Sequence, residues 1–174
     1  MNFLNPIIQT MIWELNHGYH DLSGILNNLT KEEAQWMPTP NSRTLEIIQN
    51  WNKYGNGWIK EQILDPIPTI EYLTLHIAQC KLMYNEYAFR EAKLQWKELE
   101  CPEWPESKHY LKKIQEKLVE SIKGISDKEL EKKVKTNWGD SWPIKKVIFT
   151  LIHHDAYHLG QINTIRNFYK IHNQ

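Results

Sequence analysis

Two histidines in the last fifth of the chain have a spacing that suits metal binding. His154 and His158 lie four residues apart in an apolar helical repeat, so their side chains project from one face of the predicted helix, about one turn apart. They stand where the repeat otherwise has Leu or Ile, and a buried imidazole is costly unless its ring nitrogens find partners. A divalent ion is one such partner, because imidazole is a common ligand of Zn, Ni, Fe and Cu.

His76 is a third imidazole in an apolar helical repeat, with Leu73 and Met83 as its neighbours on the predicted face. Three inward imidazoles from two helices would form an N3 site that leaves coordination positions for water or a substrate. The same residues allow a structural interpretation, in which each histidine is a hydrogen-bonded core residue. Spacing alone leaves both interpretations open.

Asp155 and Cys80 lie next to the predicted ligands. Asp155 gives the sequence His-Asp-x-x-His, one methylene shorter than the zincin motif His-Glu-x-x-His. Because a zincin also needs a sheet beside the helix, we expect Asp155 to form a salt bridge or to orient a ligand histidine. Cys80 lies one turn after His76 and could reach the same ion, although a buried cysteine usually packs as a small hydrophobic residue.

Other chemically active side chains are weaker candidates. His153 should point about 100° away from His154, which favours a surface position or one behind the ligands. Three aromatic residues could line a pocket, although packing is the simpler interpretation: Tyr157, Trp138 and Trp142. Two histidines of the first predicted helix are weaker still: His17 and His20.

Helical repeats dominate the rest of the chain, and strand patterns are scarce. Four long helices are predicted over residues 4–26, 69–87, 107–124 and 141–169, with a fifth helical segment over 44–64. Candidate caps are Thr69, Ser107 and Ser141, the segment from Thr30 to Glu33 is a capping box, and residues 137–140 form a turn. We therefore predict an all-α fold, a bundle of four long antiparallel helices with the 44–64 segment as an insert.

Composition limits the classes of function. A length of 174 residues is typical of one domain, which we place over 1–174. The chain has 21 basic and 21 acidic residues, so it lacks the basic field that nucleic-acid binding needs. We expect no signal peptide and no membrane span, because no window approaches about 20 apolar residues. With only two cysteines and no disulfide framework, the expected location is the cytoplasm.

Two segments resemble signatures of a known family. The sequence HHDAYHLGQI at 153–162, continuing to Ile165 and Arg166, resembles the last-helix signature of the DinB-like (DNA-damage-inducible) metalloprotein superfamily. Upstream, PTIEYLTLHIA at 68–78 resembles its second-helix signature. The resemblance implies an up-and-down-like four-helix bundle that binds one divalent ion, Zn, Ni or Fe, through His76, His154 and His158.

One feature departs from the family pattern. Many members reach the first ligand soon after a Pro-rich turn, whereas here residues 44–64 intervene and contain no histidine. We therefore assign the first ligand to His76 and treat 44–64 as an insert or cover between the first and second bundle helices.

The resemblance also carries expectations about activity. DinB-like relatives include transferases and isomerases that use low-molecular-weight thiols such as bacillithiol or mycothiol, and many are homodimers. The chain is accordingly expected to be a homodimeric, metal-dependent thiol S-transferase, or a hydrolase that activates water, acting on a small-molecule substrate. A non-catalytic protein that binds a metal or a small molecule is the alternative.

Overall fold

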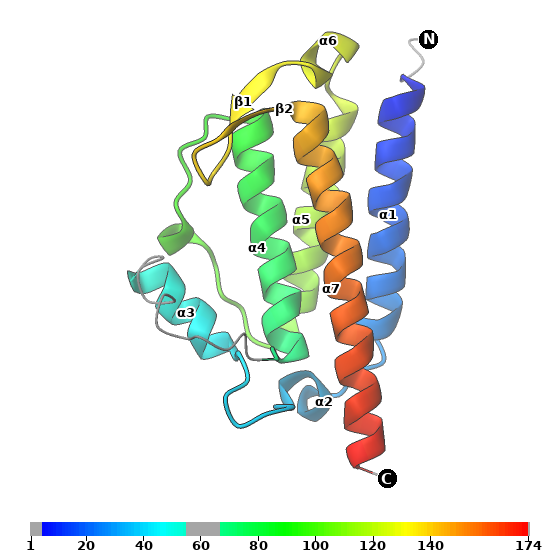
Figure 1. The fold of residues 1–174 in the computed structure, drawn as a ribbon, viewed down its shortest axis with the longest axis vertical. Helices are drawn as coiled ribbons and strands as arrows, with labels where there is room; N and C mark the ends of the chain where they lie inside the picture. Colours follow the sequence, from blue (N-terminus) through cyan, green and yellow to red (C-terminus); the bar gives the residue numbers. More distant parts are fainter. Residues whose placement is uncertain (1–4, 55–66, 174) are drawn as a thin grey trace.

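A computed structural model describes residues 5–54 and 67–173 and is mostly helical, in line with the all-α prediction. Four long helices lie side by side (Figure 1): α1 (Pro6–Leu26), α4 (Ile70–Phe89), α5 (Glu106–Lys123) and α7 (Ile144–His172). The shorter elements are α2 (Lys31–Gln35), α3 (Leu45–Tyr54), the 3-10 helix η2 (Trp96–Glu98) and α6 (Asp127–Leu130). Strands β1 (Lys133–Lys135) and β2 (Ser141–Pro143) form a small antiparallel hairpin in which Val134 faces Trp142.

Two predicted helix starts are confirmed by hydrogen bonds. The Thr30 hydroxyl accepts from the Glu33 amide at 3.1 Å, and the Glu33 carboxylate accepts from the Thr30 amide at 3.0 Å, which completes the capping box of α2. The Thr69 hydroxyl accepts from the Tyr72 amide at 3.1 Å and caps α4. This cap fixes the first turn of the helix that carries His76.

Two other predicted caps are wrong. Ser107 lies fully buried inside the first turn of α5, which begins at Glu106 after Pro105. A proline is tolerated there because the first amides of a helix have no intrahelical acceptor. Ser141 belongs to β2, and α7 begins after Pro143. Strands of three residues are too short to show an alternating pattern, although the predicted turn is present, with Gly139 at φ 100°.

The prediction that all four long helices run antiparallel to their neighbours is wrong. The segment between α4 and α5 passes back along α4, so these two helices run in the same direction (Figure 1). The Trp104 amide, just before α5, accordingly donates to the Glu71 carboxylate in the first turn of α4, at 2.7 Å. α1 and α7 also run in the same direction (Figure 1). Ile8 at the start of α1 and Ile144 at the start of α7 accordingly belong to one apolar cluster.

α4 is the most enclosed of the long helices, and it packs against both α5 and α7. Nearly every side chain from Ile70 to Lys81 is buried, His76 being only partly exposed. α3 is the described part of the predicted 44–64 segment, and it packs against α4 and η2. Residues 55–64 lie outside the described residues. None of the helices within 5–54 and 67–173 combines the length and apolar character that a membrane-spanning helix requires.

Candidate metal centre

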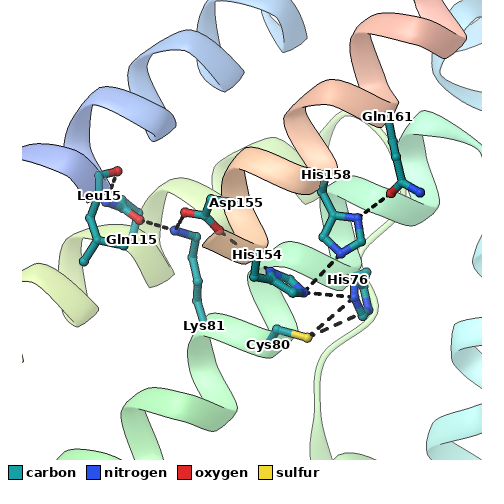
Figure 2. A network of polar contacts seen from close by, with 9 residues as sticks. All are labelled: Leu15, His76, Cys80, Lys81, Gln115, His154, Asp155, His158 and Gln161. Atoms are coloured by element: carbon teal, nitrogen blue, oxygen red, sulfur yellow. Dashed lines mark hydrogen bonds and ion pairs between the residues drawn. The ribbon is translucent and has the colours of Figure 1, made fainter. Parts of the chain in front are cut away.

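α4 and α7 bring the three predicted ligand histidines together. The Nε2 atom of His154 lies 3.2 Å from Nε2 of His76 and 3.1 Å from Nε2 of His158. Figure 2 shows the rings of His154 and His158, from α7, directed toward the His76 ring on α4. The one-turn spacing in α7 places its two rings in edge contact, with centroids 4.3 Å apart.

The hydrogen bonds around His158 leave a nitrogen lone pair directed into this cluster. Its Nδ1 atom lies 2.6 Å from Oε1 of Gln161, and the amide nitrogen of Gln161 donates to the Tyr157 hydroxyl at 3.2 Å. Because a carbonyl oxygen only accepts, Nδ1 of His158 carries the proton, and Nε2 of the neutral ring carries the lone pair. The His158 ring is therefore held in the tautomer that a metal ligand requires.

The separations of the donor atoms fit a small divalent ion. Two imidazole nitrogens bound to zinc at about 2.0–2.1 Å lie roughly 2.9 Å apart for a right angle at the metal and roughly 3.4 Å apart for a tetrahedral angle. The separations of 3.1 and 3.2 Å around His154 fall between these values. Neutral imidazoles in this arrangement can satisfy only part of their nitrogens through each other, whereas a shared cation would satisfy all the converging lone pairs.

Electrostatics favours the neutral, ligating form of two of these histidines. Burial lowers the pKa of His76 to about 3, with further contributions from His154, His158 and Arg43. Burial and the neighbouring His154 lower the pKa of His158 to about 4. Both rings are therefore neutral at physiological pH, and neither has to lose a proton before it can bind a metal.

Cys80 also belongs to this cluster. Its Sγ atom lies 3.7 Å from Nε2 of His76, and one donor atom from each of His76, Cys80 and His154 lies within 4.8 Å of the other two. Burial, with the Asp155 charge nearby, raises the pKa of the Cys80 thiol to about 12, so the thiol is protonated. The chain thus offers a possible sulfur donor beside the nitrogen donors.

A buried polar network supports the cluster from behind. The Lys81 ammonium, which is fully buried, donates to the Asp155 carboxylate and to Oε1 of Gln115, the latter at 2.7 Å. The amide nitrogen of Gln115 donates in turn to the Leu15 carbonyl at 3.2 Å, so the network joins all four long helices (Figure 2). The predicted salt bridge of Asp155 is confirmed, but its partner Lys81 was not predicted, although a lysine within an otherwise apolar helical run was a visible signal.

Asp155 connects this network to the cluster. Its Oδ1 atom lies 3.9 Å from Nδ1 of His154, and both of these buried atoms are without a hydrogen-bond partner among the described residues. Burial alone would raise the pKa of Asp155, but the Lys81 ammonium and the nearby His154 outweigh it, so the pKa is lowered. The carboxylate is therefore ionised and faces the ring nitrogen of His154 that points away from the other histidines.

Two cavities adjoin the cluster and share Tyr72 and His76 in their walls. The larger, of about 590 Å³, is also lined by His158 and Tyr157. The smaller, of about 150 Å³, is lined by Cys80. The histidine cluster is thus accessible to a small molecule from the larger cavity, whose volume is typical of ligand sites.

Except for Tyr157, the other sequence candidates lie away from the cluster. Three of the histidines are exposed: His17, His20 and His153. His17 stacks on Trp13 and pairs with Asp21. Trp138, in the turn of the hairpin, packs against Trp142 in β2, with ring centroids 4.9 Å apart. Among the three candidate aromatic residues, only Tyr157 lines the larger cavity.

Comparison with known proteins gives one family match. A model of the DinB superfamily matches residues 14–162, which is most of the chain and includes all three clustered histidines. No curated protein matches the chain.

Proposed function

The chain belongs to the DinB superfamily, and we propose on that premise that it is a metal-dependent enzyme whose divalent ion is bound by His76, His154 and His158. The observation that carries this proposal is the convergence of imidazole nitrogens at 3.1 and 3.2 Å beside a cavity of about 590 Å³. Zinc, nickel or iron would suit these donors. The four long helices would then be the bundle of the superfamily, and residues 44–64 an insert.

The proposed reaction is transfer of a nucleophile to an electrophilic substrate. When bound, a divalent ion supplies Lewis acidity that lowers the pKa of a thiol or water beside it. A low-molecular-weight thiol would form a sulfur–carbon bond while the leaving group departs with its electron pair and the thiol proton passes to solvent; with water the reaction is hydrolysis. Gln161 holds the His158 ring in its orientation, and apolar walls that include Leu73 and Ile165 limit competing water.

A non-catalytic metal site is the second candidate, and one contact favours it. With Cys80 as a fourth ligand the site would be closed, as structural zinc sites are. The Sγ atom lies 3.7 Å from Nε2 of His76, which is close enough for both atoms to bind one ion. The open cavity beside His76 and His158 supports the enzyme instead, because a structural site needs no such space.

Metal analysis combined with an activity screen tests the proposal. Purified protein should contain close to one equivalent of divalent metal, and His76→Ala and His158→Ala should each lose most of it. The loaded protein should conjugate bacillithiol, glutathione or cysteine to chlorodinitrobenzene, and His158→Ala should not. Full metal retention in both variants would refute the site.

The Cys80→Ser variant separates the two candidates. An open site predicts that it keeps both its metal and its turnover. Loss of metal in Cys80→Ser, together with no turnover by the parent protein with any thiol, would favour the structural ion.

A further inference from the structure

The lining of the larger cavity combines the histidines of the metal centre with apolar side chains. The cavity is lined by His76 and His158, by Gly160, Ile165 and Phe168 of α7, and by Leu73 in the first turn of α4. A molecule in this cavity would therefore meet apolar side chains along its body while one end reaches the metal centre.

Arg43 gives the cavity its charge. It is the only residue with a permanently charged side chain among the described residues that line it, and no Asp or Glu is among them. The backbone fixes its position, because the Arg43 carbonyl accepts from the Thr69 amide at 2.8 Å at the start of α4. Its charge also contributes to the lowered pKa of His76, so the guanidinium lies within electrostatic range of the metal centre.

A guanidinium can hold a carboxylate without giving up its other contacts. It has five N–H donors in a planar fork that matches the two oxygens of a carboxylate. One such cation beside apolar walls selects for an organic anion over a neutral molecule of the same shape.

Gly160 has no side chain and so leaves space in the cavity beside α7. A β-carbon at this position would have no neighbouring side chain or other chain segment within 4 Å, so the space beside the helix is open. A glycine inside a helix is destabilising relative to alanine, and no contact of the backbone at Gly160 requires it. Cavity space is a physical reason for a small residue here.

We propose that this cavity binds a small organic carboxylate, with the carboxylate on Arg43, the apolar body against Leu73, Ile165 and Phe168, and the reactive end at His76 and His158. This inference rests on the proposed function, because it places the substrate at the metal centre. It adds the chemical class of the substrate and names Arg43 as the residue that selects it.

A matched pair of fluorescent probes tests the charge preference. Dansylglycine carries a carboxylate, and dansylglycinamide is its neutral analogue. We expect protein treated with EDTA to bind the acid about tenfold more tightly than the amide, because a hydrogen bond to a charged group is that strong. Arg43→Met should remove the preference by weakening the acid alone, whereas Arg43→Lys should keep part of it. Equal binding of the two probes by the parent protein, or an unchanged preference in Arg43→Met, would overturn the proposal.

Variants at Gly160 test the location without touching a charge. Gly160→Phe should weaken both probes about tenfold by filling the cavity, and Gly160→Ala, the matched control, should bind them as the parent protein does. Unchanged binding in Gly160→Phe would place the probes elsewhere and refute the site. The use of metal-free protein separates the two proposals: metal content tests the histidine site, and the acid-to-amide ratio tests Arg43.

Discussion

The buried pair of Lys81 and Asp155 permits a quantitative test of what holds the metal centre in place. The side chain of Lys81 is completely buried and that of Asp155 is 6% exposed. The attraction between the two charges therefore has to offset the cost of removing each of them from water. Lys81→Met keeps the length of the side chain and removes the charge. It leaves the Asp155 carboxylate, and the Gln115 oxygen that also accepts from Lys81, without their donor.

The expected loss is large compared with the stability of an ordinary domain. Removing one partner of a buried ion pair costs about 3–5 kcal/mol, against a total free energy of unfolding of about 5–15 kcal/mol. Replacing both partners by apolar residues of similar volume is often neutral or stabilising. The double variant Lys81→Met/Asp155→Leu should therefore be more stable than either single variant, although each change alone is destabilising.

Urea unfolding of the metal-free proteins, followed by circular dichroism at pH 7.5, measures this cycle. The exposed pair of Lys145 and Glu131 is the matched control, and Lys145→Met should change the free energy of unfolding by less than about 1 kcal/mol. Additive losses in the double variant would refute the assignment of a strongly coupled ion pair. So would single variants that differ from the parent protein by no more than the control does.

The same double variant separates stability from metal binding. If Asp155 orients His154 through its Nδ1 atom, a stable protein without the carboxylate should still bind metal about 10- to 100-fold more weakly. A competition titration with a chromophoric chelator gives the two affinities. Equal affinities would show that the pair serves the core alone.

Three further outcomes follow. The metal-free protein should lose stability as pH falls from 6.5 toward 4, because His76 and His158 are neutral in the folded state and bind protons when unfolded. At pH 5 the free energy of unfolding should be lower by about 2 kcal/mol for each histidine. Urea unfolding measures this loss, and a flat pH profile would contradict the lowered pKa values. Gln161→Leu should weaken metal binding about tenfold by releasing the His158 ring, whereas Gln161→Glu, which can still accept from Nδ1, should not, as chelator competition would reveal. Trp13 and Phe149 are 60% and 57% exposed and lie on the adjacent helices α1 and α7, which leads us to expect a homodimer. Light scattering of Trp13→Glu should therefore report a smaller species than the parent protein. A parent protein that is monomeric at micromolar concentration would exclude the dimer.

Sequence reasoning succeeded where one local signal determines one local structure. The capping box at Thr30 needs only two side chains three residues apart, and α5 has one exposed and one buried face, which gives a clear helical repeat. The capping box was therefore predicted as the structure has it, and the helix over 107–124 to within one residue at each end. The β1–β2 hairpin was missed because three residues a strand carry too little periodicity. The directions of α4 and α5 were missed because the length of the segment between them does not reveal its path.

α4 shows most clearly why part of the site was not predicted. A stripe pattern distinguishes a buried face from an exposed one, but most of α4 is buried around its whole circumference. Its polar residues are therefore in the core without standing on a polar face, and two of them have distant partners: Glu71 accepts from the Trp104 amide, and Lys81 donates to Asp155, 74 residues away. His76 was predicted because the pair of His154 and His158, together with the family resemblance, suggested a shared ion, whereas nothing local to Lys81 indicates which carboxylate it meets. Only the packed arrangement of α4 and α7 reveals that the Asp155 carboxylate lies next to His154 and that the Lys81 ammonium balances its charge.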